Sequence, residues 1–484
     1  MSAWKPFSQP SNDPIKSLVI IFVLWKFVLV LLAIASPVPG YDTSTLILIR
    51  GHDLNLSRRT FYSEFHTIRE RLSLSLVRWD AIYFVKTAER GYVNEQEWAF
   101  SWVFTRLIAF FAFYLPSSKN ALESYIWAGL LISLVSHLLS VLVLHRLFIT
   151  VRKDTPNSKV AFVAAVLHII SPAGLFLSAP YGESLFSLFN FSGMLLYAKY
   201  QRAQQDRSSR HALKECYLVG SGCCFAMATS LRSNGLLSGL IFAYDVATLL
   251  PSLLGFRLDL IGFRRLLATV IAGLLTAIGF LGPQWLAYEE FCGVAMSNGH
   301  VRPWCTKLFP SIYSWVQVHY WDLGFLRYWT LSNVPLFLIA APMLWLLVQS
   351  SFTALTDQLQ AQILSTPSPS TSSPSRNSGV RQTTLRPGKE TESDDIERGC
   401  LRRLALPQLV LALTTFTSFH VQIINRISSG YPLWYLAIAI SLVKGTPLYV
   451  FGKAQSSASS WVVHWMISYA IIQGGLFASF LPPA

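Results

Sequence analysis

Two carboxylates, Asp80 and Glu95, lie in an aromatic-rich stretch that comes after the first apolar segment of the chain. The stretch reads Val77-Arg78-Trp79-Asp80-Ala81-Ile82-Tyr83-Phe84, continues with Gly91-Tyr92-Val93-Asn94-Glu95, and ends at Ala99-Phe100. Carboxylates beside a bilayer are costly to desolvate and are usually kept for chemistry or for ion pairing. We therefore predict that Asp80 is a general base, with Trp79 and Glu95 as binding residues beside it.

Simpler roles for both carboxylates remain open at this point. Asp80 could pair with Arg78 or cap the helix that follows it. Glu95 lies in a hydrophilic run, 94–97, and could be solvated.

A second motif lies at a turn between two apolar segments. It contains Ser171-Pro172-Ala173-Gly174, followed by Ser178-Ala179-Pro180-Tyr181-Gly182-Glu183-Ser184. The hydroxyl of Tyr181 could bind a sugar. Glu183 could take part in binding, or could simply interact with the positive end of its own helix.

A third motif, Leu231-Arg232-Ser233-Asn234-Gly235, interrupts an apolar run. An arginine inside an apolar segment costs at least about 2.5 kcal/mol to insert, so it should face a polar cavity or an anion. The guanidinium fork of Arg232 would suit a phosphate, with Asn234 beside it. The alternative is an internal ion pair with Asp245.

Two further motifs follow later in the chain. One contains Arg302-Pro303-Trp304-Cys305 and then Tyr320-Trp321-Asp322-Leu323-Gly324-Phe325-Leu326-Arg327-Tyr328; the other contains His420-Val421-Gln422-Ile423-Ile424-Asn425-Arg426. We take Trp321, Arg327, His420, Gln422 and Arg426 from them as candidate binding residues. Aromatic faces with polar rims suit carbohydrate, but they equally suit the interfacial belt of a membrane protein, and a lone histidine is more often structural.

The composition is that of an integral membrane protein. Of 484 residues, 52% are hydrophobic, 14% aromatic and only 13% charged, against roughly 25% charged in soluble domains. The net charge of +14 fits basic residues held on the cytoplasmic side better than nucleic-acid binding. There is no Cys-x-x-Cys, Asp-x-Asp or phosphate-binding glycine motif, so we predict no metal and no cofactor.

Apolar runs of about 20 residues predict an all-α polytopic bundle with about ten or eleven spans. The runs are 17–36, 124–148, 160–178, 183–200, 267–290, 333–349, 404–424, 433–451 and 461–481, with two short passes in 216–250 and an interfacial piece at 102–115. We favour an uncleaved first helix over a signal peptide, because Lys26 interrupts its apolar core.

Basic loops set the expected orientation. Loops 146–159, 199–214 and 257–265 should be cytoplasmic, which leaves loops 37–123 and 291–332 on the lumenal side. Asn55-Leu56-Ser57 is then a candidate glycosylation site. Cys292 and Cys305 share one lumenal loop and are a candidate disulfide.

The expected organisation has three parts. Residues 1–351 form the first part of a membrane-embedded catalytic domain, and residues 404–484 form its C-terminal helices. Between them, residues 352–403 contain a Ser/Pro/Thr-rich run, typical of a disordered cytoplasmic loop.

Taken in order, these motifs resemble the PIG-V/Gpi18 family of mannosyltransferases. The resemblance rests on Arg78-Trp79-Asp80, Gly91-Tyr92-x-x-Glu95, Ser171-Pro172-Ala173, Tyr181-x-Glu183-Ser184, Arg232-Ser233-Asn234-Gly235, Arg302-Pro303-Trp304-Cys305, Tyr320-Trp321-x-x-Gly324 and His420-x-Gln422. It covers most of the chain except 352–403. Some members carry prolines just after the Ala-Phe pair, where this chain has Ser101-Trp102.

The resemblance implies a multi-pass enzyme of the endoplasmic reticulum with a GT-C-like helical bundle. Such an enzyme adds the second mannose, in α1,6 linkage, to the precursor of the glycosylphosphatidylinositol (GPI) anchor on the lumenal side. Its donor would be dolichyl phosphate mannose and its acceptor a mannosyl-glucosaminyl-phosphatidylinositol lipid. A small accessory membrane subunit would be compatible with this role, and Asp80 takes the place of the essential acidic residue.

Three other interpretations share the polytopic architecture. A lipid transporter or scramblase would place charges near the midplane and show inverted repeats, whereas these motifs fall mostly at the predicted lumenal ends. Another polyprenyl-phosphate-sugar-dependent transferase would differ in acceptor or linkage. A non-catalytic subunit of a GPI-assembly complex need not keep a base at Asp80.

Overall fold

The structure is a computed structural model of the whole chain. It describes residues 13–37, 40–50, 68–115, 121–155, 157–205, 210–255, 257, 259–293, 302–359, 362, 388–450, 453–455 and 457–481. The candidate glycosylation site Asn55 and most of the Ser/Pro-rich segment lie outside these residues.

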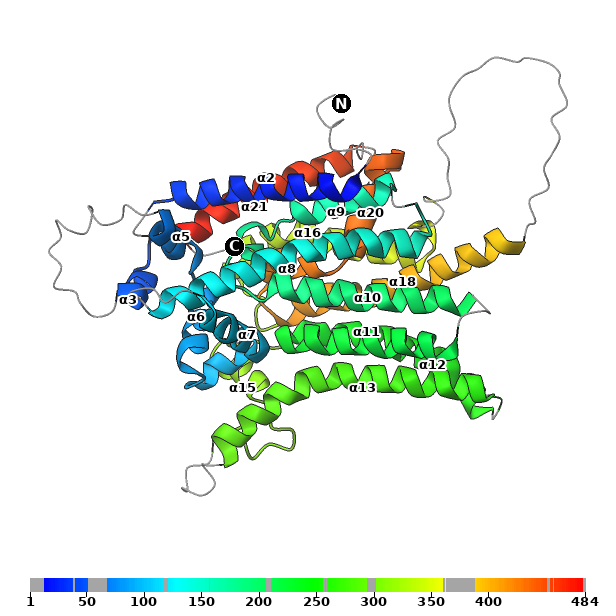
Figure 1. Cartoon of the computed structure of the whole chain (residues 1–484), viewed down its shortest axis with the longest axis horizontal. Coiled ribbons are helices and arrows are strands. Elements are labelled where there is room, and N and C mark those ends of the chain that lie inside the picture. The colour runs from blue at the N-terminus through cyan, green and yellow to red at the C-terminus, as the bar shows by residue number, and fades with distance from the viewer. Residues whose placement is uncertain are drawn as a thin grey trace, which may run out of the picture.

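The described chain is a helical bundle, which confirms the predicted all-α membrane class (Figure 1). Long helices run side by side along one direction, and several of the short helices gather at one end. The longer helices are α2 (Pro14–Ala35), α8 (Ala121–Arg152), α10 (Glu183–Gln205), α11 (His211–Leu231), α12 (Leu240–Leu254), α13 (Leu260–Tyr288), α16 (Val334–Leu355), α18 (Gly388–Ser418) and α21 (Ala458–Ala478).

The remaining elements are short. They are α3 (Ser44–Arg50), α5 (Ile68–Leu76), α6 (Asp80–Arg90), η1 (Glu95–Ala99), α7 (Trp102–Phe113), α9 (Lys159–Ile169), η2 (Gly174–Leu177), η3 (Ser233–Gly239), η4 (Glu289–Gly293), α15 (Ile312–His319), η5 (Leu331–Asn333), η6 (Val421–Ile423), α19 (Ile424–Ile427), η7 (Ser428–Gly430) and α20 (Leu433–Lys444). One antiparallel hairpin pairs β1 (Leu448–Val450) with β2 (Lys453–Gln455).

Six of the described helical segments are long and apolar enough to cross a membrane. They are Pro14–Ala35, Leu122–Arg152, Ser233–Leu254, Leu260–Gly293, Leu331–Leu355 and Ala458–Ala478. α10 and α11 are also of spanning length, with 23 and 21 residues, but they are more polar and are not among the six. Three shorter apolar helices, α7, α9 and α20, add to the bundle.

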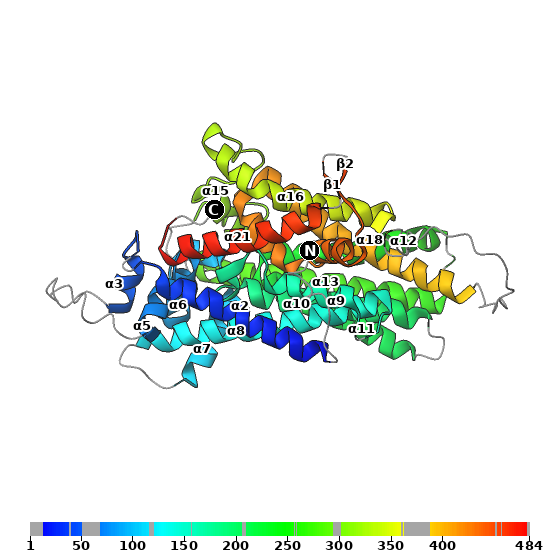
Figure 2. The ribbon, with the colours of Figure 1, turned by 90° about the horizontal axis from the view of Figure 1, so that it is seen from above.

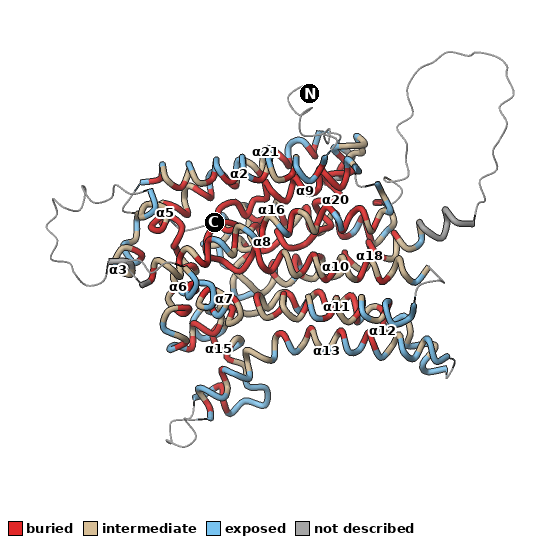
Figure 3. The backbone as a smooth tube through the Cα atoms, in the orientation of Figure 1, coloured by how far each residue is buried: buried red, intermediate tan, exposed pale blue. Residues whose placement is uncertain are grey.

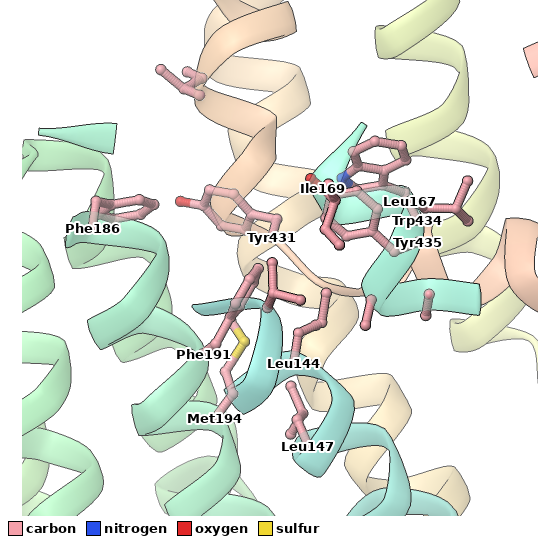
Figure 4. Packing of buried hydrophobic residues seen from close by; sticks show 14 of the residues in the cluster. Leu144, Leu147, Leu167, Ile169, Phe186, Phe191, Met194, Tyr431, Trp434 and Tyr435 are labelled. Carbon is pink, nitrogen blue, oxygen red and sulfur yellow. The ribbon is translucent and has the colours of Figure 1, made fainter. Parts of the chain in front are cut away.

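The core lies between α8, α9, α10 and α20, where residues are buried on nearly every side (Figure 3). In Figure 4, Leu144 of α8, Phe191 of α10 and Tyr435 of α20 belong to this packed cluster. The outer helices expose apolar side chains such as Leu274 of α13, as expected for a surface that faces lipid. Seen from above, α2 and α21 lie on the near side of the bundle (Figure 2).

The short helices that follow the chemical motifs lie at one end of the bundle. In Figure 1, α3, α6, α7 and α15 lie on the left, whereas the end of α10 and the starts of α11 and α13, which carry basic residues such as Arg202, Lys214 and Arg264, lie on the right. The sequence motifs are therefore brought to the end opposite the basic loops.

α18 begins well before the predicted membrane segment. The predicted loop 352–403 ends inside it, because residues 394–403 are anchored to the bundle by ion pairs. Nε of Arg403 lies 2.7 Å from Oδ1 of the fully buried Asp245, and Nε of Arg402 donates to Asp357 over 3.0 Å. The structure thus places residues 388–403 in a helix.

Candidate active site

Four charged residues from distant parts of the chain meet at the end of the bundle that carries the motifs. Nη1 of Arg426 donates a 3.0 Å hydrogen bond to Oδ2 of Asp80, and its Nε lies 2.8 Å from Oε1 of Glu183. The same Oε1 accepts a 2.6 Å hydrogen bond from Nη1 of Arg232. The two acids and two arginines form one continuous chain, which we call the acid–arginine cluster.

The ends of helices position these side chains. Asp80 is the first residue of α6, Glu183 is the first residue of α10, and Arg232 is the C-cap of α11. Arg426 lies in the single turn of α19, between two 3-10 helices. Because both acids stand in the first turn of a helix, the positive end of each helix stabilises their charge.

The side chains of the cluster differ in how far they are exposed. The side chain of Glu183 is 1% exposed, that of Arg426 is 13% exposed, and that of Asp80 is 33% exposed. Asp80 is therefore the more accessible of the two carboxylates. Oε2 of Glu183 is buried and accepts no hydrogen bond from the described residues.

Aromatic rings surround Arg426. Its guanidinium lies 5.0 Å from the ring centre of Phe176 and 5.2 Å from that of Tyr181. Burial lowers the pKa of Arg426, but the neighbouring Glu183 and Asp80 outweigh that effect and raise it, so the residue stays charged. The Tyr181 hydroxyl donates to the backbone carbonyl of Arg78 over 3.0 Å, which ties this ring to the start of α6.

His420 and Gln422 lie beside the cluster. The His420 ring packs edge-on against Tyr328, 4.9 Å between centres, and the Tyr328 hydroxyl donates to Oε1 of Gln422 over 3.2 Å. Burial lowers the pKa of His420, and Arg426 adds to this effect, while Asp80 opposes it. His420 is therefore neutral at pH 7 and able to give or accept a hydrogen bond.

Asn234 is held near Arg232 by Tyr431. Its side chain donates to the Tyr431 hydroxyl over 3.2 Å, and that hydroxyl donates to the Asn234 carbonyl over 2.9 Å. These bonds fix the turn between α11 and η3. Asn234 thus supports the position of Arg232.

Glu95 organises the neighbouring loops. Its carboxylate accepts hydrogen bonds from Nε1 of Trp304 and Nε1 of Trp315, each over 3.1 Å, and from the Tyr320 hydroxyl over 3.2 Å. Nε of Arg302 lies 3.6 Å from it. Glu95 is therefore buried and not solvated. We call the three residues that donate to it, Trp304, Trp315 and Tyr320, the aromatic cap.

A disulfide between Cys292 and Cys305 holds the same cap, with Cα atoms 5.8 Å apart. Both cysteines are buried in a small cluster with Trp98 and Trp304.

Three other predicted site residues contact groups outside the cluster. Arg327 is exposed and pairs with Asp322 over 3.2 Å. Trp321 packs edge-on against Phe100, with 5.9 Å between ring centres. Trp79 donates from Nε1 to the carbonyl of Leu481 over 3.2 Å.

The structure decides two alternatives left open by the sequence. Asp80 pairs with Arg426 and not with Arg78. Arg232 pairs with Glu183, because Asp245 lies further along α12 and binds Arg403 instead. Within the described ranges, no three His, Cys, Asp or Glu side chains gather where they could hold a metal ion.

Comparison with known proteins gives a consistent result. A family model described as "Mannosyltransferase (PIG-V)" matches residues 15–484. The chain is 41% identical to a protein of Aspergillus oryzae named GPI mannosyltransferase 2, over 100% of both chains. It is 30% identical to a protein of the same name in Schizosaccharomyces pombe, over 92% of this chain and 79% of that one.

A solved structure of an oligosaccharyltransferase from Archaeoglobus fulgidus, tethered to an acceptor peptide, is more distantly similar. The TM-score is 0.44 at 11% identity, and the match covers 100% of this chain and 56% of the other. The chain thus spans about half the length of that protein. This likeness carries no argument about function.

Proposed function

Because this chain belongs to the PIG-V mannosyltransferase family, we propose that it adds the second mannose, in α1,6 linkage, to the GPI precursor. The donor is dolichyl phosphate mannose and the acceptor is a lipid that carries one mannose. The reaction takes place on the lumenal face of the endoplasmic reticulum membrane. The name shared by the Aspergillus and fission-yeast relatives supports this assignment.

The chemistry requires inversion at the anomeric carbon. The bond from that carbon to the phosphate oxygen breaks, and its electron pair leaves with dolichyl phosphate. The 6-hydroxyl oxygen of the acceptor mannose forms the new bond from the opposite face, and its proton passes to a base. A phosphate leaving group needs little protonation, so one base and a source of positive charge suffice.

Asp80 is the proposed base, and the hydrogen bond from Arg426 is the single observation that carries the assignment. The carboxylate is held in place by Arg426 but remains one-third exposed, so a hydroxyl can approach it. Its second oxygen, Oδ1, is not the one that Arg426 binds. That oxygen is the proton acceptor in the proposed reaction.

Arg426 and Arg232 supply the positive charge. Both arginines form an ion pair with Glu183, so neither can move far when the substrates bind. As negative charge builds on the departing phosphate, fixed guanidinium groups stabilise it without reorganisation. Glu183, through its free Oε2, and the neutral His420 are proposed to bind sugar hydroxyls.

The catalytic domain, in this proposal, is formed by 1–351 together with 404–484, since Asp80 comes from the first part and Arg426 from the second. The aromatic cap around Glu95, with Trp321 at its edge, borders the sugar-binding side. An accessory membrane subunit remains compatible with this arrangement.

The test is the identity of the precursor that accumulates in cells lacking this protein. The proposal expects a GPI lipid with one mannose, and expects it to disappear when the wild-type chain is restored. Accumulation of a mannose-free or a three-mannose lipid would contradict the assignment of this step.

A further inference from the structure

Arg78 is a buried arginine that forms no ion pair at contact distance with a described residue, although the charge of Asp42 acts on it from further away. Its side chain belongs to the largest fully buried groups of the protein, at 2% exposure. Nε is buried and has no hydrogen-bond acceptor, and no described residue accepts a hydrogen bond from the rest of the guanidinium. Buried charges are normally paired, so an unpaired one indicates an absent partner.

The three arginines among the candidate binding residues are already neutralised. Arg232 pairs with Glu183, Arg327 with Asp322, and Arg426 with both Asp80 and Glu183. The acid–arginine cluster contains two arginines and two carboxylates, so its formal charge is zero. The proposed reaction brings together two lipids that each carry a phosphate, which leaves the cluster short of positive charge.

The surroundings of Arg78 are hydrophobic on one side and close to the cluster on the other. Its guanidinium lies 4.7 Å from the ring centre of Phe480, in the segment after α21. Its backbone carbonyl accepts the hydrogen bond from Tyr181, whose ring faces Arg426. Burial lowers the pKa of Arg78 to about 10, while Asp42 acts in the opposite direction, so the group is still charged at pH 7.

Two residues next to Arg78 have a strained backbone: Trp79, which follows it in the chain, and Phe480, which packs against its guanidinium. Trp79 has a φ of 53° and Phe480 a φ of 59°, values that non-glycine residues rarely adopt. Their rings pack together with centres 5.2 Å apart. Such strain persists where the surrounding structure maintains it, and it concentrates at ligand-binding sites.

We propose that Arg78 binds the phosphate of a lipid substrate, at a second anion site next to the acid–arginine cluster. Phe480 and Trp79 form its apolar wall, against which the lipid side of the phosphate packs. The shared chemistry is a lipid phosphate, which either the polyprenyl donor or the phosphatidylinositol acceptor can supply. This inference rests on the proposed function for the identity of the lipids.

The test is a binding titration on the purified full-length protein, with dolichyl phosphate in one arm and phosphatidylinositol in the other. Arg78→Gln should weaken the binding of one of these lipids by about 10- to 100-fold, the effect of losing a charged hydrogen bond. If only the binding of dolichyl phosphate weakens, Arg78 binds the phosphate of the donor. If only the binding of phosphatidylinositol weakens, Arg78 binds the phosphate of the acceptor. Unchanged binding in both arms overturns the proposal.

Two further variants make the result specific. Arg106→Gln removes an exposed arginine that stacks over Trp102, and it should change neither affinity more than about twofold. Arg78→Lys keeps the positive charge but loses the paired donors of the guanidinium, so it should fold like the wild type. It should weaken the binding of the same lipid by less than Arg78→Gln does. If Arg78→Gln fails to fold, the lysine variant decides: unchanged affinity for both lipids overturns the proposal.

The titration also separates this inference from the proposed function, because it needs no turnover. Asp80→Asn, which the proposed mechanism makes inactive, should still bind both lipids, and adding Arg78→Gln to it should weaken the binding of the same lipid as in the wild type. A protein that transfers no mannose but still loses lipid binding on Arg78→Gln would contradict the proposed reaction and support the anion site.

Discussion

Arg426 and Asp80 are 346 positions apart in the chain, yet a 3.0 Å hydrogen bond joins Nη1 of one to Oδ2 of the other. The bond connects the start of α6 to the short helices that precede α20, across the segment that the sequence predicts to be disordered. The second contact of Arg426, to the buried Glu183, fixes the guanidinium in one orientation. The position of the proposed base therefore depends on a residue from the far end of the chain.

Glu183→Gln should destabilise the protein strongly. The substitution leaves the guanidinium groups of Arg232 and Arg426 buried with less negative charge beside them. Breaking a buried ion network on one side costs about 3–5 kcal/mol. Thermal unfolding in detergent should therefore show a clear loss of stability relative to the wild type.

The matched control is Glu215→Gln, which breaks the surface pair between Glu215 and Arg264. That pair is also 2.8 Å long, but the side chains of Arg264 and Glu215 are 46% and 31% exposed, against 1% for Glu183. Because water screens exposed pairs, its loss should hardly alter the unfolding temperature. Equal effects of the two substitutions would show that Glu183 does not hold the cluster together.

Glu95→Gln should loosen the aromatic cap. The carboxylate accepts three hydrogen bonds, from Trp304, Trp315 and Tyr320, whereas an amide offers one acceptor oxygen and adds donors of its own. A loss of at least about 2 kcal/mol is expected. Tryptophan fluorescence should shift to the red as indole rings become hydrated.

Glu289→Gln serves as the comparison for this change, since Glu289 is an exposed acid in the nearby η4. Its spectrum and stability should match those of the wild type. If Glu95→Gln also matches the wild type, then Glu95 does not organise the cap.

The stability of the turn that leads into η1 should depend on pH through Glu97. Burial raises the pKa of Glu97, but hydrogen bonds from the backbone of Val93, the side chain and backbone of Asn94, and the charge of Arg90 outweigh it and leave the pKa lowered. A carboxyl with a lowered pKa in the folded state stabilises the fold above the unfolded pKa of about 4.3, and this contribution is lost as the pH falls through the lower folded value.

The unfolding temperature of the wild type should therefore fall more steeply below about pH 4.3 than that of Glu97→Gln, which cannot titrate there. At pH 7 the variant should be the less stable of the two. Parallel curves at all pH values would show that Glu97 contributes no such linkage.

The helices and their grouping could be predicted from the sequence, because long apolar runs have few alternatives in a membrane. The run 17–36 corresponds to α2 at Pro14–Ala35, and the run 461–481 to α21 at Ala458–Ala478. The basic loops correctly indicated that the motifs would share one end of the bundle. α18 starts earlier than predicted, because ion pairs extend it beyond its apolar part.

The pairing of charges could not be predicted, because it depends on how distant helices pack. Arg78 is the nearest cation to Asp80 in sequence, but the positive φ of Trp79 turns the chain between them and sends the two side chains to different partners. The sequence suggests Arg78 only as a possible partner of Asp80 and does not mark it as a binding residue of its own. Its one signal was an arginine in an apolar context with no second acid nearby.

The burial of Glu95 was harder to predict than the pairing of charges, because its hydrophilic neighbours suggested that it is exposed. The signal was present elsewhere: the loop 302–321 contains several indole and phenol donors, which need acceptors once buried. Only the fold brings Trp304 and Trp315 to the same carboxylate.

The most direct measurement is the rate of mannose transfer by purified Asp80→Asn, with dolichyl phosphate mannose as donor and the one-mannose lipid as acceptor. The amide keeps the size of Asp80 but cannot take up the hydroxyl proton, so the rate should fall by about 100- to 10,000-fold while the unfolding temperature stays near that of the wild type. A rate within about tenfold of the wild type would contradict the central claim that Asp80 is the base.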